Sequence, residues 1–359
     1  MQTDEVEKVF IPIFLGKRGG GEQLYLQTTN DFEKYSIKNI PVTSIEVYSR
    51  HRIQNALVFY VPHKFKDLSI KYNILSNWKP LVKLFKHMKT NNFAFYLLQI
   101  MPSPFDLFFD FFAKRKKITI IRCIHDLRPH TGEIWPTNRA IKRRIRNADV
   151  LVTFSDSIRK ELSEITSKLV LRADLPDKIF PEHPTLINRV KCSKQIPKLV
   201  ILGRAKAYKG FETLAAALPI VKSKYEFYAF GEGVYPDSLK AYGTLHNHWQ
   251  TDFELGNALN LADIIIFPYI EASQSGLIPI AKGLNKFIIF SDIPGLIEQV
   301  DTYSNSIMFA KGNVHALASA IENAIHQVST KPDFENETPI ASHFNNSLAT
   351  VVKNYVEKV

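Results

Sequence analysis

The chain has 359 residues, of which 45% are hydrophobic, and it carries a formal net charge of +11. This length fits two domains of ordinary size, and the hydrophobic content excludes a largely disordered chain. The excess of cations favours anionic partners, which are nucleic acid, phosphorylated small molecules or an acidic membrane face. The two cysteines, Cys123 and Cys192, are too few for a disulfide framework or a cysteine-based metal site, so we interpret them as reduced thiols.

The N-terminal sequence MQTDEVEKVF is charged and lacks the layout of a signal peptide. No run of ~18 apolar residues is present, so we expect no membrane-spanning helix. These two features predict a cytoplasmic location.

The first half alternates apolar, strand-like runs with amphipathic stretches; the runs lie at 9–16, 118–126 and 148–156. The segment 104–117, PFDLFFDFFAKRKK, has two interpretations. It is either a helix that packs its aromatic face on a sheet, or an interfacial membrane segment. The segment 139–147, RAIKRRIRN, is basic throughout, which is consistent with an anionic lipid surface or a phosphate-linked acceptor.

The second half repeats the alternation, with apolar runs at 198–204, 225–233, 262–269 and 286–292. Strands that are apolar on both faces and alternate with helices are typical of parallel sheets. The segment 174–197 contains four prolines and little apolar periodicity, which predicts a linker. We therefore predict an α/β protein with two Rossmann-like domains.

The segment GRAKAYKGFETL (203–214) carries the first motif. Arg204 follows a predicted strand, and Lys209 precedes a predicted helix that begins near Phe211. Ligands of open parallel sheets bind at the carboxyl ends of the strands. An arginine can bind two phosphate oxygens and a lysine supplies a point charge, so the pair suits a pyrophosphate. The alternative is two solvated surface cations.

The segment PYIEASQSGLIPIAKG (268–283) carries the second motif. We expect a helix to begin near Ser273, with its unpaired N–H groups facing phosphate oxygens. This interpretation places four residues beside a diphosphate, namely Ser273, Gln274, Ser275 and Gly276. The Glu271 carboxylate would repel phosphate and is expected to bind sugar hydroxyl groups. The alternative is an N-cap serine beside an exposed glutamate.

Two weaker signals lie in the first half. His125 ends a predicted strand and is expected to face the cleft between the two halves, although it is also compatible with a structural histidine. Gly19, Gly20 and Gly21 would let the backbone approach a ligand closely, or would form a flexible turn. The chain contains no D-x-D sequence, so we do not expect a metal-bridged diphosphate site of that type.

Taken together, these motifs resemble those of GT-B glycosyltransferases, in particular glycosyltransferase family 4. The resemblance is most specific over about 198–325, where GRAKAYKG and the segment 262–300 match the family's phosphate and donor-site segments and 312–325 matches the helix that follows. It implies an acceptor-binding domain at 1–175, a nucleotide-sugar-binding domain at 176–337, and a C-terminal helix at 338–359 that returns to the first domain.

The resemblance also implies residue roles. Arg204 and Lys209 would bind the donor diphosphate, His125 would lie near the donor sugar, and Glu271 would match the first glutamate of the family's E-x7-E signature. The sequence departs from that signature, because Ile280 stands where the second glutamate is expected, nine positions after Glu271.

The implied activity is a retaining, metal-independent hexosyl transfer from a UDP- or GDP-linked sugar to a glycan or lipid-linked acceptor, with no cofactor. Bacterial surface polysaccharide assembly (capsule, exopolysaccharide or O-antigen) is the expected role. An anionic membrane surface is a candidate partner, with the protein peripheral on the inner face. Two alternatives remain open: a nucleotide-sugar-binding protein without transferase activity, and a basic nucleic-acid-binding protein, although no nucleic-acid-binding motif is present.

Overall fold

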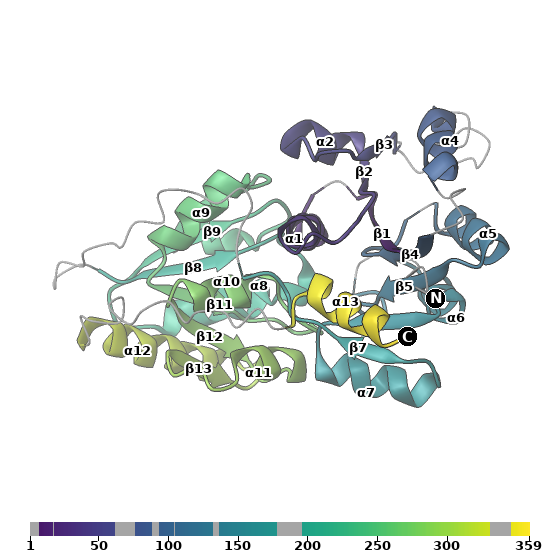
Figure 1. The fold of residues 1–359 in the computed structure, drawn as a ribbon. Helices are drawn as coiled ribbons and strands as arrows, with labels where there is room; N and C mark the ends of the chain where they lie inside the picture. Colours follow the sequence, from purple (N-terminus) through teal and green to yellow (C-terminus); the bar gives the residue numbers. More distant parts are fainter. Residues whose placement is uncertain are drawn as a thin grey trace. The chain divides into compact units, whose positions relative to one another are not determined.

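The protein folds into two compact α/β units, and the structure is a computed structural model (Figure 1). The residues that it describes are 7–16, 18–61, 76–87, 93–103, 105–131, 136–177, 196–330 and 346–359. The first unit comprises Met1–Arg128, Trp135–Leu175 and Phe344–Val359, and the second comprises Pro129–Ile134 and Pro176–His343.

The first unit is built on a seven-stranded sheet in the order β3-β2-β1-β4-β5-β6-β7. All neighbouring strands pair in parallel. The strands are β1 (Glu7–Phe14), β2 (Val42–Ser44), β3 (Leu57–Phe59), β4 (Phe93–Gln99), β5 (Thr119–Cys123), β6 (Val150–Thr153) and β7 (Val170–Arg172). The three strands predicted from the apolar runs of the first half are confirmed as β1, β5 and β6.

The helices of the first unit are α1 (Gly20–Lys34), α2 (Ile45–His51), α4 (Trp78–His87), α5 (Asp106–Lys116), α6 (Asn138–Asn147), α7 (Asp156–Ile165) and α13 (Leu348–Lys358). Helices α6, α7 and α13 each begin at a Ser or Thr cap whose side chain accepts a backbone N–H. The C-terminal helix α13 buries Leu348, Val352 and Val356 in the same core cluster as Leu24 and Tyr25 of α1. The expected return of the C-terminal helix to the first domain is thus confirmed.

The second unit has a six-stranded parallel sheet in the order β10-β9-β8-β11-β12-β13. Its strands are β8 (Lys198–Leu202), β9 (Glu226–Phe230), β10 (Gly243–His246), β11 (Ile264–Phe267), β12 (Phe287–Ser291) and β13 (Ser306–Phe309). Its helices are η2 (Ala207–Lys209), α8 (Phe211–Ala217), η3 (Leu218–Ile220), η4 (Asp237–Ala241), α9 (Asp252–Leu261), α10 (Leu277–Gly283), α11 (Pro294–Val300) and α12 (Val314–Thr330). The four predicted strands and the predicted helix at 312–325 are confirmed, whereas 178–195 of the predicted linker and 338–345 of the C-terminal segment lie outside the described residues.

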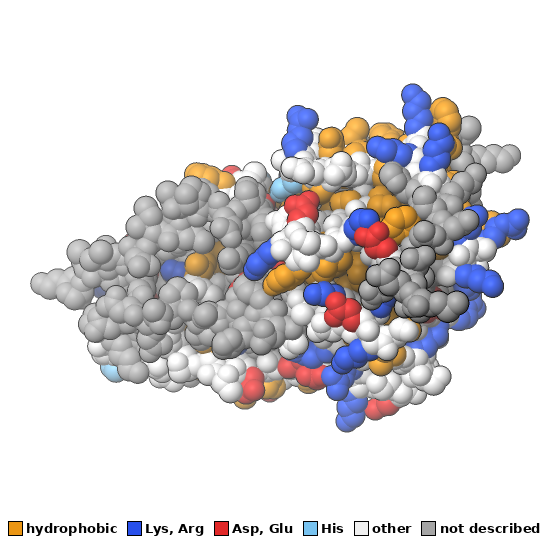
Figure 2. Space-filling view, viewed as in Figure 1, with side chains coloured by type: hydrophobic (Ala, Val, Ile, Leu, Met, Phe, Trp, Pro, Cys, Tyr) orange, Lys and Arg blue, Asp and Glu red, His pale blue; other side chains and the backbone are white. Residues whose placement is uncertain are grey.

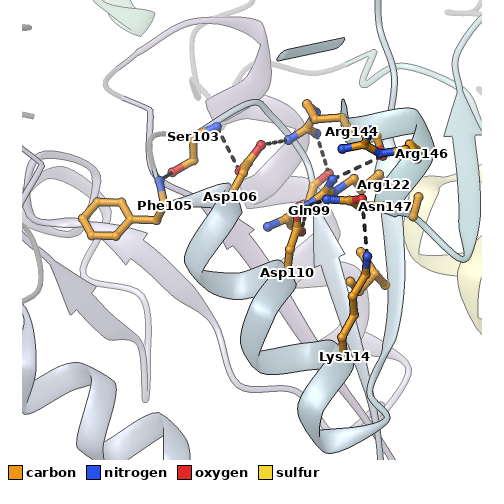
Figure 3. Close-up of polar contacts among 12 residues, drawn as sticks. Gln99, Ser103, Phe105, Asp106, Asp110, Lys114, Arg122, Arg144, Arg146 and Asn147 are labelled. Atoms are coloured by element: carbon orange, nitrogen blue, oxygen red, sulfur yellow. Dashed lines mark hydrogen bonds and ion pairs between the residues drawn. The ribbon is translucent and has the colours of Figure 1, made fainter. Parts of the chain in front are cut away.

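Buried ion pairs connect α5 and α6 to the sheet of the first unit (Figure 3). Arg144 of α6 is 1% exposed and donates to Asp106 Oδ2 of α5 at 2.6 Å. The same guanidinium donates to the carbonyl oxygens of Met101 at 3.3 Å and Cys123 at 3.2 Å, at the ends of β4 and β5. One charged side chain therefore holds two helices and two strand ends in place.

A second buried pair lies beside the first. Arg122 of β5 is fully buried and pairs with Asp110 of α5, and its Nε donates to Gln99 Oε1 at 2.5 Å. Asn147 Nδ2 also donates to Asp110, at 2.7 Å (Figure 3). Both carboxylates of α5 thus face inward, and the exposed charged residues of this helix are all cations.

These pairs correct one interpretation of the basic segment at 139–147. We expected its cations to face an anionic lipid or acceptor, but Arg144 lies in the interior and is paired with Asp106. Within the aromatic segment at 104–117, Asp106–Lys116 form α5, and Phe105 and Phe109 are buried in the core, as a sheet-packing helix requires. Among the described residues, no helix has the length and apolar character needed to cross a membrane.

We predict that Arg144→Met lowers the free energy of unfolding by about 3–5 kcal/mol, because it leaves the Asp106 carboxylate buried without its ion-pair partner. Arg146→Met is the matched control: Arg146 is exposed on the same helix, and its loss should change stability by about 0.5 kcal/mol or less. Urea denaturation of both variants measures the difference. Equal midpoints would show that the buried pair does not stabilise the first unit.

Candidate functional site

The candidate site lies in the second unit, at the carboxyl ends of β8 and β11. These strands are parallel neighbours in the sheet, so the segments that follow them begin at the same edge. The first segment, 203–210, contains Arg204 and Lys209, and the second, 268–276, contains Glu271. Two motifs that are about 60 residues apart in the sequence are therefore brought together, as the strand-end argument predicts.

The two segments are in direct contact at Gly210. This glycine has φ +74°, and a Cβ atom placed on it would lie 1.7 Å from the carbonyl oxygen of Pro268. Next to this contact, the amide of Ile270 donates to the carbonyl of Tyr208 at 2.8 Å. Only glycine combines this backbone conformation with so close an approach, so Gly210 fixes the spacing of the two segments.

Lys209 lies between the segments and has an unusual environment for an ammonium group. Its Nζ atom donates to the hydroxyl of Tyr269 at 2.5 Å and lies 4.0 Å from the centroid of that ring. The pKa of Lys209 is lowered to about 8, chiefly by burial and also by the positive charge of Arg204, against a raising effect of Tyr208. An anion bound here would offset both the burial and the repulsion between the two cations.

The segment 273–276 differs from the expectation. We predicted a helix that begins near Ser273, but α10 begins at Leu277 and has seven residues. The reason is a clamp from α11: Gln299 accepts from the Ser275 amide at 2.7 Å and donates to the Ser275 carbonyl at 3.1 Å. These bonds hold Ser275 outside the helix and occupy its amide.

The other residues of this segment differ in accessibility. Ser275 is 4% exposed, and its hydroxyl lies 3.2 Å from that of Tyr269. The carbonyl of Ser273 lies against Gly295 of α11, where a Cβ would come within 2.0 Å of it. Gln274 is half-buried, while Gly276 is exposed and a Cβ placed on it would meet no atom within 4 Å. Gly276 therefore borders open space, whereas Ser275 supports the side chain that contacts Lys209.

Glu271 is exposed and already has a partner. Its carboxylate accepts from the Thr131 hydroxyl at 2.6 Å and from the Thr131 amide at 3.2 Å. These hydrogen bonds lower the pKa of Glu271, and the charges of His130 and Lys311 contribute further. A carboxylate that accepts an alcohol and an N–H can also accept the hydroxyl groups of a sugar.

Ile280, at the position of the expected second glutamate, is 7% exposed and belongs to the core of the second unit. It supplies no polar group to the site.

His125 lies in the first unit, directly after β5. Its ring stacks on Phe154 with centroids 4.7 Å apart. Burial lowers the pKa of His125 and the charge of Arg144 lowers it further, whereas Asp126 and a hydrogen bond to the backbone of Ile100 raise it. The net depression favours a neutral imidazole at neutral pH.

The three glycines at 19–21 also lie in the first unit, where α1 begins. Gly19 has φ +110°, and Gly20 borders open space, since a Cβ placed on it would meet no atom within 4 Å. Gly21 has a packing role, because a Cβ there would lie 2.6 Å from Met101. In the first turn of α1, the buried Glu22 pairs with Arg50. The negative charge of this carboxylate disfavours binding of an anion at the start of the helix.

Several residues that build the site were not predicted from the sequence, namely Tyr208, Gly210, Tyr269, Gln299 and Thr131. Gly210 and Tyr269 lie inside the quoted motifs, and the glycine that follows Lys209 was a usable signal. Gln299 and Thr131 contact residues 24 and 140 positions away, and no local pattern predicts such contacts.

We predict that Gly210→Ala destabilises the second unit by about 2 kcal/mol or more, because the added methyl group overlaps the Pro268 carbonyl. Gly256→Ala in α9 is the control: its Cβ would meet no atom within 4 Å, and alanine favours a helix by about 1 kcal/mol. Thermal unfolding should therefore move in opposite directions in the two variants. A melting temperature of Gly210→Ala equal to that of the unmodified protein would contradict the contact.

A known family matches the segment that contains the candidate site. Residues 196–327 match the model of the family described as Glycosyl transferases group 1, which confirms the predicted resemblance over this part of the chain. No curated protein sequence gives a match.

Solved structures match both units. A glycosyltransferase from Rickettsia africae is 14% identical, with 98% of this chain and 97% of that chain covered and a TM-score of 0.67. HepE from Anabaena, in complex with UDP and glucose, is 14% identical, with 98% and 99% covered and a TM-score of 0.70. The catalytic domain of starch synthase IV from Arabidopsis thaliana, bound to ADP and acarbose, is 10% identical, with 98% of each chain covered and a TM-score of 0.67. At these identities the likeness establishes the fold, and the predicted GT-B class is confirmed.

Proposed function

We propose that this chain, whose residues 196–327 match the family Glycosyl transferases group 1, transfers a hexose from a nucleoside-diphosphate sugar to an acceptor hydroxyl. The observation that carries the proposal is the environment of Lys209. Its side chain is half-buried, its ammonium group donates to Tyr269, and it is close enough to Arg204 for the two charges to repel. A cation in such a place needs an anion, and a diphosphate supplies one.

The diphosphate would lie beside Lys209 and Arg204 and extend toward the open space at Gly276. Arg204 is exposed and can bind two phosphate oxygens, while Lys209 contributes a fixed point charge. Ser273 and Gln274 belong to the same segment and are proposed to lie beside the diphosphate. Ser275 would contribute indirectly, because it contacts Tyr269 and is held by Gln299. The two cations would stabilise the charge that develops on the departing diphosphate, which is our reason for proposing a metal-independent reaction.

The hexose of the donor would bind at Glu271. Thr131 supplies a hydroxyl and an amide to this carboxylate, and sugar hydroxyl groups are equivalent donors. Binding of the donor would therefore exchange one set of hydrogen bonds for another.

The reaction breaks the bond between the anomeric carbon and the phosphate oxygen and forms a bond from that carbon to the acceptor oxygen. We propose retention of configuration, with the departing phosphate oxygen taking the proton of the acceptor hydroxyl. We also propose that His125 takes part in the transfer as a neutral imidazole, a state that the lowering of its pKa favours. Gly19 and Gly20 would contribute backbone next to the acceptor.

The donor base and acceptor are proposed by class. HepE is described in complex with UDP-glucose as well as with UDP and glucose, which supports a UDP-linked hexose as the first donor to test. A GDP-linked hexose is the second. We propose a glycan or lipid-linked acceptor of bacterial surface polysaccharide assembly on the basis of the family resemblance and the positive charge of the chain.

The proposal is tested by incubating the protein with UDP- and GDP-hexoses and measuring release of the nucleoside diphosphate. We predict turnover that falls about 100-fold or more in Arg204→Met and in Lys209→Met, because each variant removes a charge that acts in the transition state. Lys206→Met is the matched control, since Lys206 is half-buried in the same segment and has no proposed role. Binding of the donor without turnover in the unmodified protein would favour a nucleotide-sugar-binding protein instead.

A second prediction separates the sugar from the diphosphate. Glu271→Ala should lower turnover of the complete donor by about 30-fold or more, because charge-assisted hydrogen bonds to the sugar are lost. Its affinity for the bare nucleoside diphosphate should be almost unchanged. Thr131→Val removes the hydroxyl that donates to Glu271 in place of the sugar, so this variant should not weaken donor binding. If Glu271→Ala weakens both ligands equally, the carboxylate has a structural role.

A further inference from the structure

Helices α4 and α5 of the first unit share an outer surface that the proposed transfer reaction does not use. The two helices pack through aromatic rings: Phe85 of α4 stacks on Phe112 of α5 with centroids 4.0 Å apart and approaches Phe108 at 6.0 Å. Their inner sides are filled by core residues such as Leu84 and Phe109. Among the described residues, the core contacts of these two helices are thus made by their inner sides.

The outer side nevertheless carries large apolar side chains. Phe111 is 67% exposed, Trp78 55%, Leu107 48% and Val82 41%. Trp78 and Val82 are four residues apart on α4, and so are Leu107 and Phe111 on α5, so each pair lies on one side of its helix. We call these four residues and the cations around them the α4–α5 face. Exposed apolar groups at this density mark an interaction surface.

Among the residues that the structure describes, the charge of the α4–α5 face has a single sign. Its exposed cations are Lys79, Lys83, Lys86, Lys114, Arg115 and Lys116. Helix α4 contains no acidic residue, and both acidic residues of α5 are buried and paired with arginines. Figure 2 shows blue Lys and Arg side chains next to orange hydrophobic ones at the end of the first unit that carries α4.

We propose that the α4–α5 face docks the chain onto an anionic membrane surface. Aromatic and aliphatic groups surrounded by lysine and arginine match the boundary between acyl chains and acidic headgroups. A second copy of the chain is a poor partner for this face, because two such faces would bring twelve like charges together, six from each copy. The buried pairs Arg144–Asp106 and Arg122–Asp110 contribute to the docking surface, since they remove the α5 carboxylates from it.

The proposal does not rest on the transfer reaction, and it is tested without a nucleotide sugar. Sedimentation with phosphatidylcholine vesicles, with and without one quarter phosphatidylglycerol, measures the partition of the full chain. We expect binding to the anionic vesicles only, weakened by salt. Lys79→Gln with Lys83→Gln should lower the partition about 30-fold, at about 1 kcal/mol for each cation. Phe111→Ser should lower it about tenfold.

Matched variants in the second unit control for general loss of charge or apolar area. Lys222→Gln with Lys224→Gln removes two exposed cations, and Phe253→Ser removes a ring that is 56% exposed. Both should bind vesicles as the unmodified protein does, and circular dichroism should show all variants folded. Equal binding to neutral and anionic vesicles, unchanged binding of the α4–α5 variants, or a dimer that Phe111→Ser dissociates would each overturn the proposal. Loss of vesicle binding with turnover retained would leave the proposed transfer reaction intact.

Discussion

The contact between Gly210 and the Pro268 carbonyl is the constraint on which the candidate site depends. It brings the segment after β8 against the segment after β11, with no room for any side chain at position 210. Lys209, the preceding residue, is thereby held against the ring of Tyr269. Tyr269 in turn contacts Ser275, and Gln299 of α11 holds Ser275 by two hydrogen bonds. The close contact between the backbones of Gly210 and Pro268 therefore determines where the Lys209 ammonium group lies.

This arrangement has an electrostatic cost that points to a ligand. Burial and the neighbouring Arg204 both disfavour the charged form of Lys209, whose pKa falls to about 8. In the first unit the buried cations Arg122 and Arg144 are each matched by an aspartate. Lys209 has a phenol and aromatic faces as its neighbours, which stabilise a cation less than a carboxylate does. The two buried arginines of the first unit thus have carboxylate partners, whereas the half-buried Lys209, in the segment that matches a glycosyltransferase family, has neutral ones.

Sequence patterns predicted the features that depend on neighbours along the chain. The apolar runs became β1, β5, β6, β8, β9, β11 and β12, and the topology of parallel sheets was enough to place Arg204, Lys209 and Glu271 at one sheet edge. The predictions that depended on distant partners were wrong or incomplete. The helix start near Ser273 was wrong because Gln299 holds Ser275, and the basic segment at 139–147 was misinterpreted at Arg144 because its partner Asp106 lies on another helix. Phe111 is exposed whereas the nearby Phe109 is buried, because of the way α5 is oriented on the sheet. Phenylalanines occur on several sides of this helix, so its sequence does not specify which side faces the core.

The central claim is that a diphosphate binds at the Lys209 ammonium, and proton linkage tests it most directly. With a pKa of about 8, Lys209 is partly deprotonated at pH 8 in the free protein, and a bound diphosphate raises its pKa. Titration calorimetry of UDP and GDP at pH 8, in buffers of different ionisation enthalpy, should show uptake of roughly half a proton on binding, with affinity falling as the pH rises through 8. Lys209→Arg keeps the charge but does not titrate, so its binding should take up none. Binding by the unmodified protein without proton uptake, or equal uptake in Lys209→Arg, would contradict the account.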